Sequence, residues 1–227
     1  MSIQINYNKN APQKSMSNMV LFVDEKFNIL PIKKYLKNLE FSFIRDLLKT
    51  SDLKQKILTF DISSKKKIVL VSVAKSLKNF EVENIGANFY DYIKDKKQND
   101  YILNSDTVQS GLKNFIGFFL HGLKLKSYKF SKYKSKKDNK KITLFITGKN
   151  KTSSKDQIKF KSIEEGTFYT RDLVSEPGNI LHPDEYARRL NSLKKFGLRV
   201  NIYDEKKLKK LGMNTLLGVG QGSIRGS

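Results

Sequence analysis

The chain has 227 residues, 38% hydrophobic content and a formal net charge of +22, which is enough apolar material to build a core and excludes a disordered tail. The absence of cysteine excludes a disulfide framework and a thiolate zinc site, and two lone histidines, His121 and His182, do not make a metal cluster. No stretch approaches the roughly 20 apolar residues of a membrane span, and the start lacks a signal-peptide pattern, so we expect a soluble, cytoplasmic protein without a membrane partner.

Strands and amphipathic helices alternate through the first 148 residues. The predicted strands are 19–23, 56–62, 68–73, 101–103 and 142–147, and the predicted helices are 35–48, 80–93 and 111–125. The second and third strands are joined by a polar link and are expected to form a hairpin. We expect a break in the first helix near Glu40. This alternation predicts an α/β fold, a mixed sheet flanked by helices.

The helix over 111–125 is the most apolar in the chain and is expected to be buried on more than one side. It contains His121, which we interpret as a core or edge histidine because no second metal ligand lies at helical spacing. No glycine-rich loop between a strand and a helix in residues 1–161 supports a nucleotide-like ligand at a strand end.

A lysine-rich run over 124–141 mixes nine lysines with Tyr128, Phe130 and Tyr133. Aromatic side chains among basic ones can stack on bases, so weak nucleic-acid binding by a non-enzymatic basic module is the alternative function. The preferred interpretation is a solvated, partly extended connection. Only six of the 44 basic residues in the chain are arginine, the usual side chain for phosphate, and a low-GC genome would write a similar excess of lysine.

The densest group of helix start and stop signals lies around 170–185. A helix is expected from Ser162 to Val174, and Pro177-Gly178-Asn179 cannot continue it. Pro183 then opens a second helix, with carboxylates suited to its positive end. The polar residues 149–161 before this region are expected to form a linker.

Beyond the second helix, which Gly197 should end, the pattern predicts a strand at 198–203, a short helix at 204–211 and an extended piece at 215–219. These elements are too few to bury a core of their own. We therefore expect an N-terminal α/β domain at 1–148, a linker at 149–161, and the truncated opening of a second α/β domain at 162–227.

Several patterns that suggest chemistry have simpler explanations. Gly218–Ser223 lacks the lysine and the spacing of a phosphate loop and is expected to be a tight connection. The carboxylate pairs Glu164-Glu165 and Asp204-Glu205 are expected in first helical turns, where capping explains them. Arg171 and Asp172 are expected to serve an ion pair or a helix end.

Three stretches carry a family resemblance. Arg171–Pro183 resembles the segment Arg-Asp-Leu-Val-Asn-x-Pro-Pro-Asn-x-Leu-Thr-Pro by which cytosolic leucine aminopeptidases enter their catalytic domain, although Ser175, Gly178 and His182 depart from it at non-catalytic positions. The run Ser127–Lys137 resembles the family's Ser-Tyr-Arg-Phe-x-x-Phe-Lys-x-Lys-Lys. Leu211-Gly212-Met213 and the glycines at 218–222 resemble its Leu-Gly-Met and Val-x-Gln-Gly-Ser pair.

This resemblance implies a metalloexopeptidase that hydrolyses N-terminal amino acids from peptides with two divalent ions, manganese or zinc, in a cytoplasmic homo-hexamer. The family's metal ligands and catalytic residues lie beyond the Gln-Gly-Ser segment. No catalytic, metal-binding or substrate-binding residue is therefore assigned here, no metal is expected to bind this chain, and the chain alone is expected to be inactive.

Overall fold

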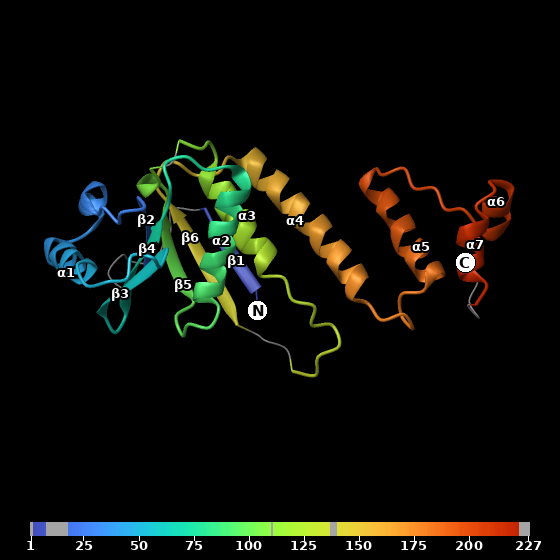
Figure 1. The fold of residues 1–227 in the computed structure, drawn as a ribbon, viewed down its shortest axis with the longest axis horizontal. Coiled ribbons are helices and arrows are strands. Elements are labelled where there is room, and N and C mark those ends of the chain that lie inside the picture. The colour runs from blue at the N-terminus through green and yellow to red at the C-terminus, as the bar shows by residue number, and fades with distance from the viewer. Residues whose placement is uncertain (1, 8–17, 110, 137–139, 223–227) are drawn as a thin grey trace. The chain divides into compact units, whose positions relative to one another are not determined.

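The computed structural model describes residues 2–7, 18–109, 111–136 and 140–222 (Figure 1). The chain divides into two compact units, Met1–Phe168 and Tyr169–Ser227.

The first unit is built on a six-stranded sheet with strand order β1-β6-β5-β2-β4-β3. The strands are β1 (Ser2–Asn6), β2 (Asn18–Val23), β3 (Ile57–Ser63), β4 (Lys66–Ser72), β5 (Asp100–Asn104) and β6 (Lys141–Thr147). All neighbours are parallel except β3 and β4, which form the expected antiparallel hairpin. The α/β fold and its mixed sheet are confirmed, whereas β1, with its alternating Ile3 and Ile5, was not predicted.

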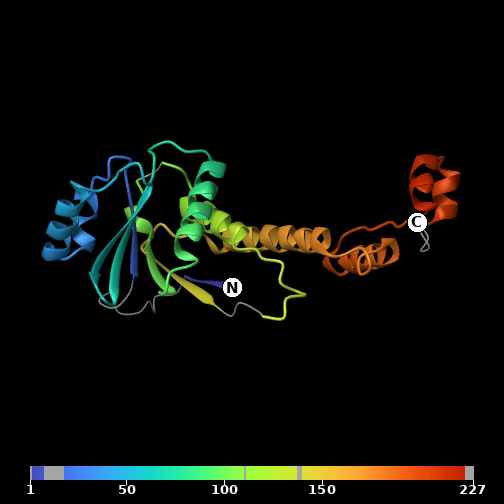
Figure 2. The same ribbon diagram turned by 60° about the horizontal axis from the view of Figure 1, so that its bottom comes forward.

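Both faces of the sheet are covered, which explains the continuous apolar run of β2. Val20 and Phe22 face a core beneath α2 (Asn79–Ile93) and α3 (Phe115–Lys126). The alternate residue Leu21 faces a second core on the side of η1 (Leu30–Tyr35) and α1 (Asn38–Leu48). Figures 1 and 2 show α1 on one side of the sheet and the α2–α3 pair on the other.

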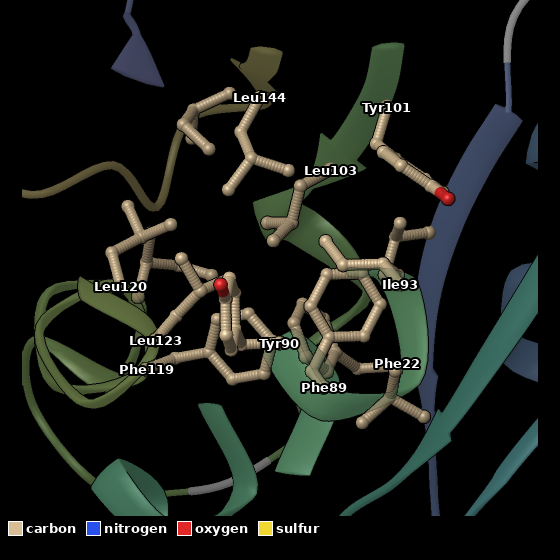
Figure 3. Packing of buried hydrophobic residues seen from close by; sticks show 14 of the residues in the cluster. Phe22, Phe89, Tyr90, Ile93, Tyr101, Leu103, Phe119, Leu120, Leu123 and Leu144 are labelled. Atoms are coloured by element: carbon tan, nitrogen blue, oxygen red, sulfur yellow. The ribbon is translucent and has the colours of Figure 1, made fainter. Parts of the chain in front are cut away.

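Aromatic rings fill the larger core. The ring of Phe22 meets that of Phe119 edge-on, with centroids 5.3 Å apart, and Phe119 meets Phe89 at 5.4 Å (Figure 3). Such pairs add about 1 kcal/mol each to the apolar burial. The predicted burial of the helix over 111–125 is confirmed, although the helix begins only at Phe115.

Two glycines let α2 and α3 cross at short range. A side-chain carbon at Gly86 would overlap the carbonyl group of Phe119, and one at Gly122 would overlap the carbonyl group of Glu83. Any larger residue at either position would force the helices apart.

The break expected near Glu40 lies between η1 and α1. Glu40 is at the third position of α1, where its carboxylate accepts a hydrogen bond from the backbone N–H of Lys37 (3.1 Å) and contacts the Lys66 ammonium in β4 (2.6 Å). Burial raises the pKa of Glu40, but these hydrogen bonds and the lysine charges outweigh it and leave the pKa below its usual value. A carboxylate therefore both starts α1 and joins it to the sheet.

Helix α4 (Ser154–Ser175) corrects two expectations. Residues 154–161 of the expected linker are helical, because the hydroxyl of Ser153 accepts a hydrogen bond from the backbone N–H of Asp156 (3.1 Å) and starts the helix. Glu164 and Glu165 consequently lie in the middle of a helix rather than in its first turn. The domain limits proposed from the sequence remain a prediction.

The second unit contains, after the end of α4, the helical elements α5 (Pro183–Asn191), η3 (Ser192–Phe196), α6 (Glu205–Lys210) and α7 (Asn214–Gly220). The helix break at Pro177, the start of α5 at Pro183 and the end of η3 at Gly197 (φ 83°) are confirmed. In the part of the chain that the structure describes, no helix is long and apolar enough to cross a bilayer.

Two predictions in this unit are wrong. Residues 198–203 form no strand, because no neighbouring strand pairs with them among the described residues, and Leu198 and Ile202 are half exposed. Residues 215–219 belong to α7 instead of an extended piece. A short apolar run does not distinguish helix from strand, and the leucines in this run favour a helix.

Candidate functional site

The first unit has a cavity of about 360 Å³. Titratable side chains from distant parts of the sequence line it, and no sequence motif predicted that they would lie together. Its walls come from β1, the segment after it, α3 and α4. Ile5, Leu120 and Phe160 form an apolar side, and polar groups of three elements form the other.

His121 belongs to this polar side. It is buried, as expected, and its Nδ1 lies 3.0 Å from Oε1 of Glu164. The ring of Phe160 covers the imidazole with centroids 5.0 Å apart. The expectation that capping explains Glu164 is wrong, since this carboxylate is the hydrogen-bond partner of a histidine 43 residues away.

Lys124 and Tyr7 complete the polar side. The Lys124 ammonium donates to the carbonyl oxygen of Ile3 (2.6 Å), and burial lowers the pKa of Lys124 while the charge of Glu164 opposes that shift. Burial raises the pKa of Tyr7 to about 12, with Thr152 opposing the rise and Glu164 adding to it. Tyr7 therefore keeps its proton at neutral pH and can donate a hydrogen bond.

The residues present do not fit the two-metal centre that the family resemblance implies. Within the described ranges, no three His, Asp or Glu side chains come together to hold an ion. His182 is the N-cap of α5, with its Nδ1 3.9 Å from Asp184 Oδ2. Asp172 lies in the last turn of α4.

Carboxylates of the second unit accept hydrogen bonds from arginine side chains and from a backbone amide. Glu185 accepts hydrogen bonds from Arg188 (2.6 Å) and Arg189 (2.7 Å), and these bonds lower the pKa of Glu185 to about 2. Arg189 also contacts Glu176 at 3.0 Å. Asp204 caps α6 by accepting from the backbone N–H of Lys207 (2.8 Å), which confirms its predicted role.

The lysine-rich run serves internal packing in several places. After α3 ends, 127–136 form neither helix nor strand, as expected of a connection. The ring of Tyr128 lies 5.4 Å from that of Phe168, and Phe130 lies 5.8 Å from Tyr133. The Lys140 ammonium donates to the carbonyl oxygens of Lys94 and Lys96. Weak nucleic-acid binding remains a prediction.

The glycine-rich segment near 220 is no phosphate loop. Gly218 and Gly220 lie within the last turn of α7 and only Gly222 follows it, so these glycines do not join a strand to a helix. The expected tight connection over Gly218–Ser223 is wrong at 218–220, which are helical, and Ser223 lies outside the described residues.

Comparison with known proteins identifies relatives of both units. Residues 168–227 match the profile described as "Cytosol aminopeptidase family, catalytic domain". A probable cytosol aminopeptidase of Clostridium perfringens is 30% identical over 212 residues, covering 88% of this chain and 41% of that protein. One from a Bradyrhizobium species is 40% identical over 111 residues, covering 47% of this chain and 22% of that protein.

Solved structures share the fold. A mutant of tomato leucine aminopeptidase superposes with a TM-score of 0.73 at 15% identity, covering 100% of this chain and 49% of that one. The bottromycin maturation enzyme BotP in complex with Mn gives a TM-score of 0.67 at 14% identity, covering 93% and 43%.

The chain thus spans less than half the length of the relatives that it matches. The catalytic-domain profile covers the end of α4, the helix break at Pro177 and the glycine-rich segment, and the Clostridium relative aligns over most of both units. On this evidence the chain belongs to the cytosol aminopeptidase family.

Proposed function

We propose that this chain forms the N-terminal part of a metal-dependent leucyl aminopeptidase that hydrolyses N-terminal amino acids from peptides. The observation that carries the proposal is the match of residues 168–227 to the family's catalytic domain, directly after an α/β unit that also aligns with a relative. In this proposal the first unit precedes the catalytic domain.

The metal chemistry of such an enzyme would need residues other than those described here. A relative's structure holds Mn, whereas the described carboxylates and histidines of this chain do not gather into a metal centre. We therefore propose that two divalent ions, manganese or zinc, belong to the longer enzyme and that the chain alone hydrolyses no peptide. Two such ions would activate water and polarise the scissile carbonyl group.

The remaining features of the proposal follow the family. The substrates would be peptides with large apolar N-terminal residues, the complete enzyme would be a homo-hexamer, and its compartment would be the cytoplasm, in keeping with the names of its relatives.

The experiment has two arms. The chain is purified from a host that lacks its own enzyme of this family and is incubated with leucine p-nitroanilide and Mn²⁺ or Zn²⁺. We expect no release of p-nitroaniline above that of a protein-free blank. The gene is read beyond the codon for Ser227, where we expect an open frame that encodes a lysine and several carboxylates. Hydrolysis by the chain alone would overturn the proposed inactivity, and a stop codon at that point would overturn the peptidase assignment of this polypeptide.

A further inference from the structure

The cavity of about 360 Å³ between β1, α3 and α4 plays no part in the proposed peptide hydrolysis, although charged groups line it. We call it the α3–α4 cavity. All of its lining residues belong to the first unit. Its volume falls within the usual range for small-molecule sites, about 300–1,000 Å³, which combine an apolar wall with a few polar groups that orient the ligand.

A carboxylate with one unused oxygen lines this cavity. Oε1 of Glu164 is engaged by Nδ1 of His121 at 3.0 Å, and the Glu164 side chain is only 13% exposed. Its Oε2 has no hydrogen-bond partner among the described residues, yet it is not one of the buried polar atoms that are sealed from solvent. The same holds for Nε2 of His121, whose side chain is 7% exposed. Both atoms are therefore open to a small molecule in the cavity.

A partly buried ammonium group lies on the same face of α3. Lys124 follows His121 by three residues and also lines the cavity. Its ammonium donates to the carbonyl oxygen of Ile3 (2.6 Å), and no carboxylate of a described residue lies within 4 Å of it. Burial lowers the pKa of Lys124, which shows that this charge is poorly compensated where it stands. A charge withdrawn from water is usually paired, so an anionic group of a ligand would suit it.

The neutral hydroxyl of Tyr7 adds a further donor to this side of the cavity. The charge of Glu164 acts on the pKa of both Tyr7 and Lys124, so the three groups lie near one another. An anionic ligand without a cation would meet the unpaired oxygen of Glu164, and a cationic ligand without an anion would meet the ammonium of Lys124. A ligand that carries both charges satisfies both groups.

The remaining wall of the cavity is apolar. Its side chains are those of Ile5, Leu120, Phe160 and Phe168. They offer an aliphatic or aromatic group a surface away from water, and burial of such a group favours binding. An ammonium, a carboxylate and an apolar side chain occur together in an apolar α-amino acid.

We propose that the α3–α4 cavity binds a free apolar α-amino acid in its zwitterionic form. The ammonium of the ligand donates to Oε2 of Glu164, and its carboxylate accepts from Lys124 and Tyr7. The side chain of the ligand packs on the apolar wall. The site does not rest on the proposed peptidase activity, because its test measures binding to the chain and no hydrolysis.

The test titrates the full chain with leucine, isocaproate, isoamylamine and glycine, followed by calorimetry and by the ring NMR signals of His121. Isocaproate lacks the ammonium of leucine, isoamylamine lacks its carboxylate, and glycine lacks its side chain. We expect saturable binding of leucine with a shift of the His121 signals. The other three compounds should bind at least about tenfold more weakly, because each loses a charge-assisted hydrogen bond or the apolar contact.

Two variants assign each charge of the ligand to its partner. Glu164→Gln should weaken leucine binding about tenfold but should not weaken isocaproate binding, since isocaproate has no ammonium to lose. Lys124→Met should weaken the binding of leucine and isocaproate about tenfold and leave that of isoamylamine unchanged. The matched control is Lys126→Met, which removes a lysine of the same helix that contacts Asp91 (3.0 Å) and does not line the cavity. It should leave the affinity for leucine unchanged.

Several outcomes would overturn the proposal. They are the lack of saturable leucine binding, equal affinities for leucine and isocaproate, and a leucine complex that leaves the His121 signals unchanged. Equal weakening by Lys124→Met and Lys126→Met would show non-specific attraction of carboxylates to a chain of net charge +22 and would also overturn it. If Glu164→Gln failed to fold, Lys124→Met and the four compounds would decide in its place.

Discussion

Nδ1 of His121 in α3 and Oε1 of Glu164 in α4 lie 3.0 Å apart in the interior of the first unit. The two side chains are only 7% and 13% exposed, so water cannot readily replace either partner. Since 43 residues separate them in sequence, the pair fixes the first part of α4 against the packed helices.

Loss of the Glu164 carboxylate should destabilise the first unit. We expect Glu164→Ala to lower the free energy of unfolding by about 1–2 kcal/mol, because it leaves the buried imidazole without its partner. Urea denaturation followed by circular dichroism measures the change. The control is Glu165→Ala, whose carboxylate is 68% exposed and 3.7 Å from Lys161, and which should change the stability by less than about 0.5 kcal/mol. Equal effects of the two variants would contradict a special role for the buried pair.

The crossing of α2 and α3 should not tolerate a methyl group. Gly122→Ala is expected to lower the free energy of unfolding by about 2–3 kcal/mol, because the added carbon would overlap the Glu83 carbonyl group and displace a helix. Gly166→Ala provides the control within α4, where nothing lies within 4 Å of the added carbon. It should stabilise the chain by about 0.5–1 kcal/mol through helix propensity alone. The measurement is thermal unfolding. If both variants unfolded at a higher temperature than the unaltered chain, the close crossing would be disproved.

The buried pair of Glu40 and Lys66 should be more sensitive to the loss of one partner than to the loss of both charges. Each side chain is 9% exposed. Lys66→Met is expected to destabilise by about 3 kcal/mol, because it leaves a buried carboxylate uncompensated, and adding Glu40→Gln should restore part of this loss. Urea denaturation of the single and double variants measures both steps. A double variant less stable than Lys66→Met would refute this account.

The same pair predicts a dependence on pH. The pKa of Glu40 is lowered in the folded state, so its ionisation stabilises the fold above the usual glutamate pKa of about 4.3. That stabilisation is lost as the pH falls through the lower pKa of the folded protein. The stability difference between the unaltered chain and Glu40→Gln should therefore be largest at neutral pH and shrink below about pH 4. A difference that stayed constant from pH 7 to pH 3 would contradict the prediction.

Glu185 should titrate at an unusually low pH. Its pKa is lowered to about 2 by hydrogen bonds from Arg188 and Arg189. Carbon-detected NMR of the side-chain carboxyl group measures this value directly, and Arg189→Met should move it toward the usual value of about 4.3. The contribution of Glu185 to stability is present above that usual value and is lost as the pH falls toward 2. A pKa unchanged in Arg189→Met would show that this arginine does not hold the carboxylate.

Elements with a strong local pattern were predictable from the sequence. The runs that became β2 and β4 are continuously apolar because both sheet faces are covered, and the break between η1 and α1 follows from the capping position of Glu40. Strand β1 was not predicted, because its five residues contain only two large apolar side chains. The helical start at Ser154 was missed because polar composition suggested a linker, although Ser153 and Asp156 have the spacing of a capping pair.

The candidate sites depended on contacts that local patterns do not contain. Tyr7, His121 and Glu164 meet only because β1, α3 and α4 pack together. Lys124 was inconspicuous in the sequence as one lysine of the basic run, and its partial burial is visible only once its surroundings are known. Conversely, residues 198–203 have the pattern of a strand but no described strand to pair with them, so composition alone misassigned them.

Helix α4 runs without interruption across the limit between the two units at Phe168. A shortened protein designed to end at residue 161, where the sequence suggested a linker, would cut this helix in its first half. It would also remove Glu164 and Phe168, the partners of His121 and of the Tyr128 ring. Anyone isolating the first unit should keep the chain through Ser175, because the segment that joins the two units is also a wall of the first one.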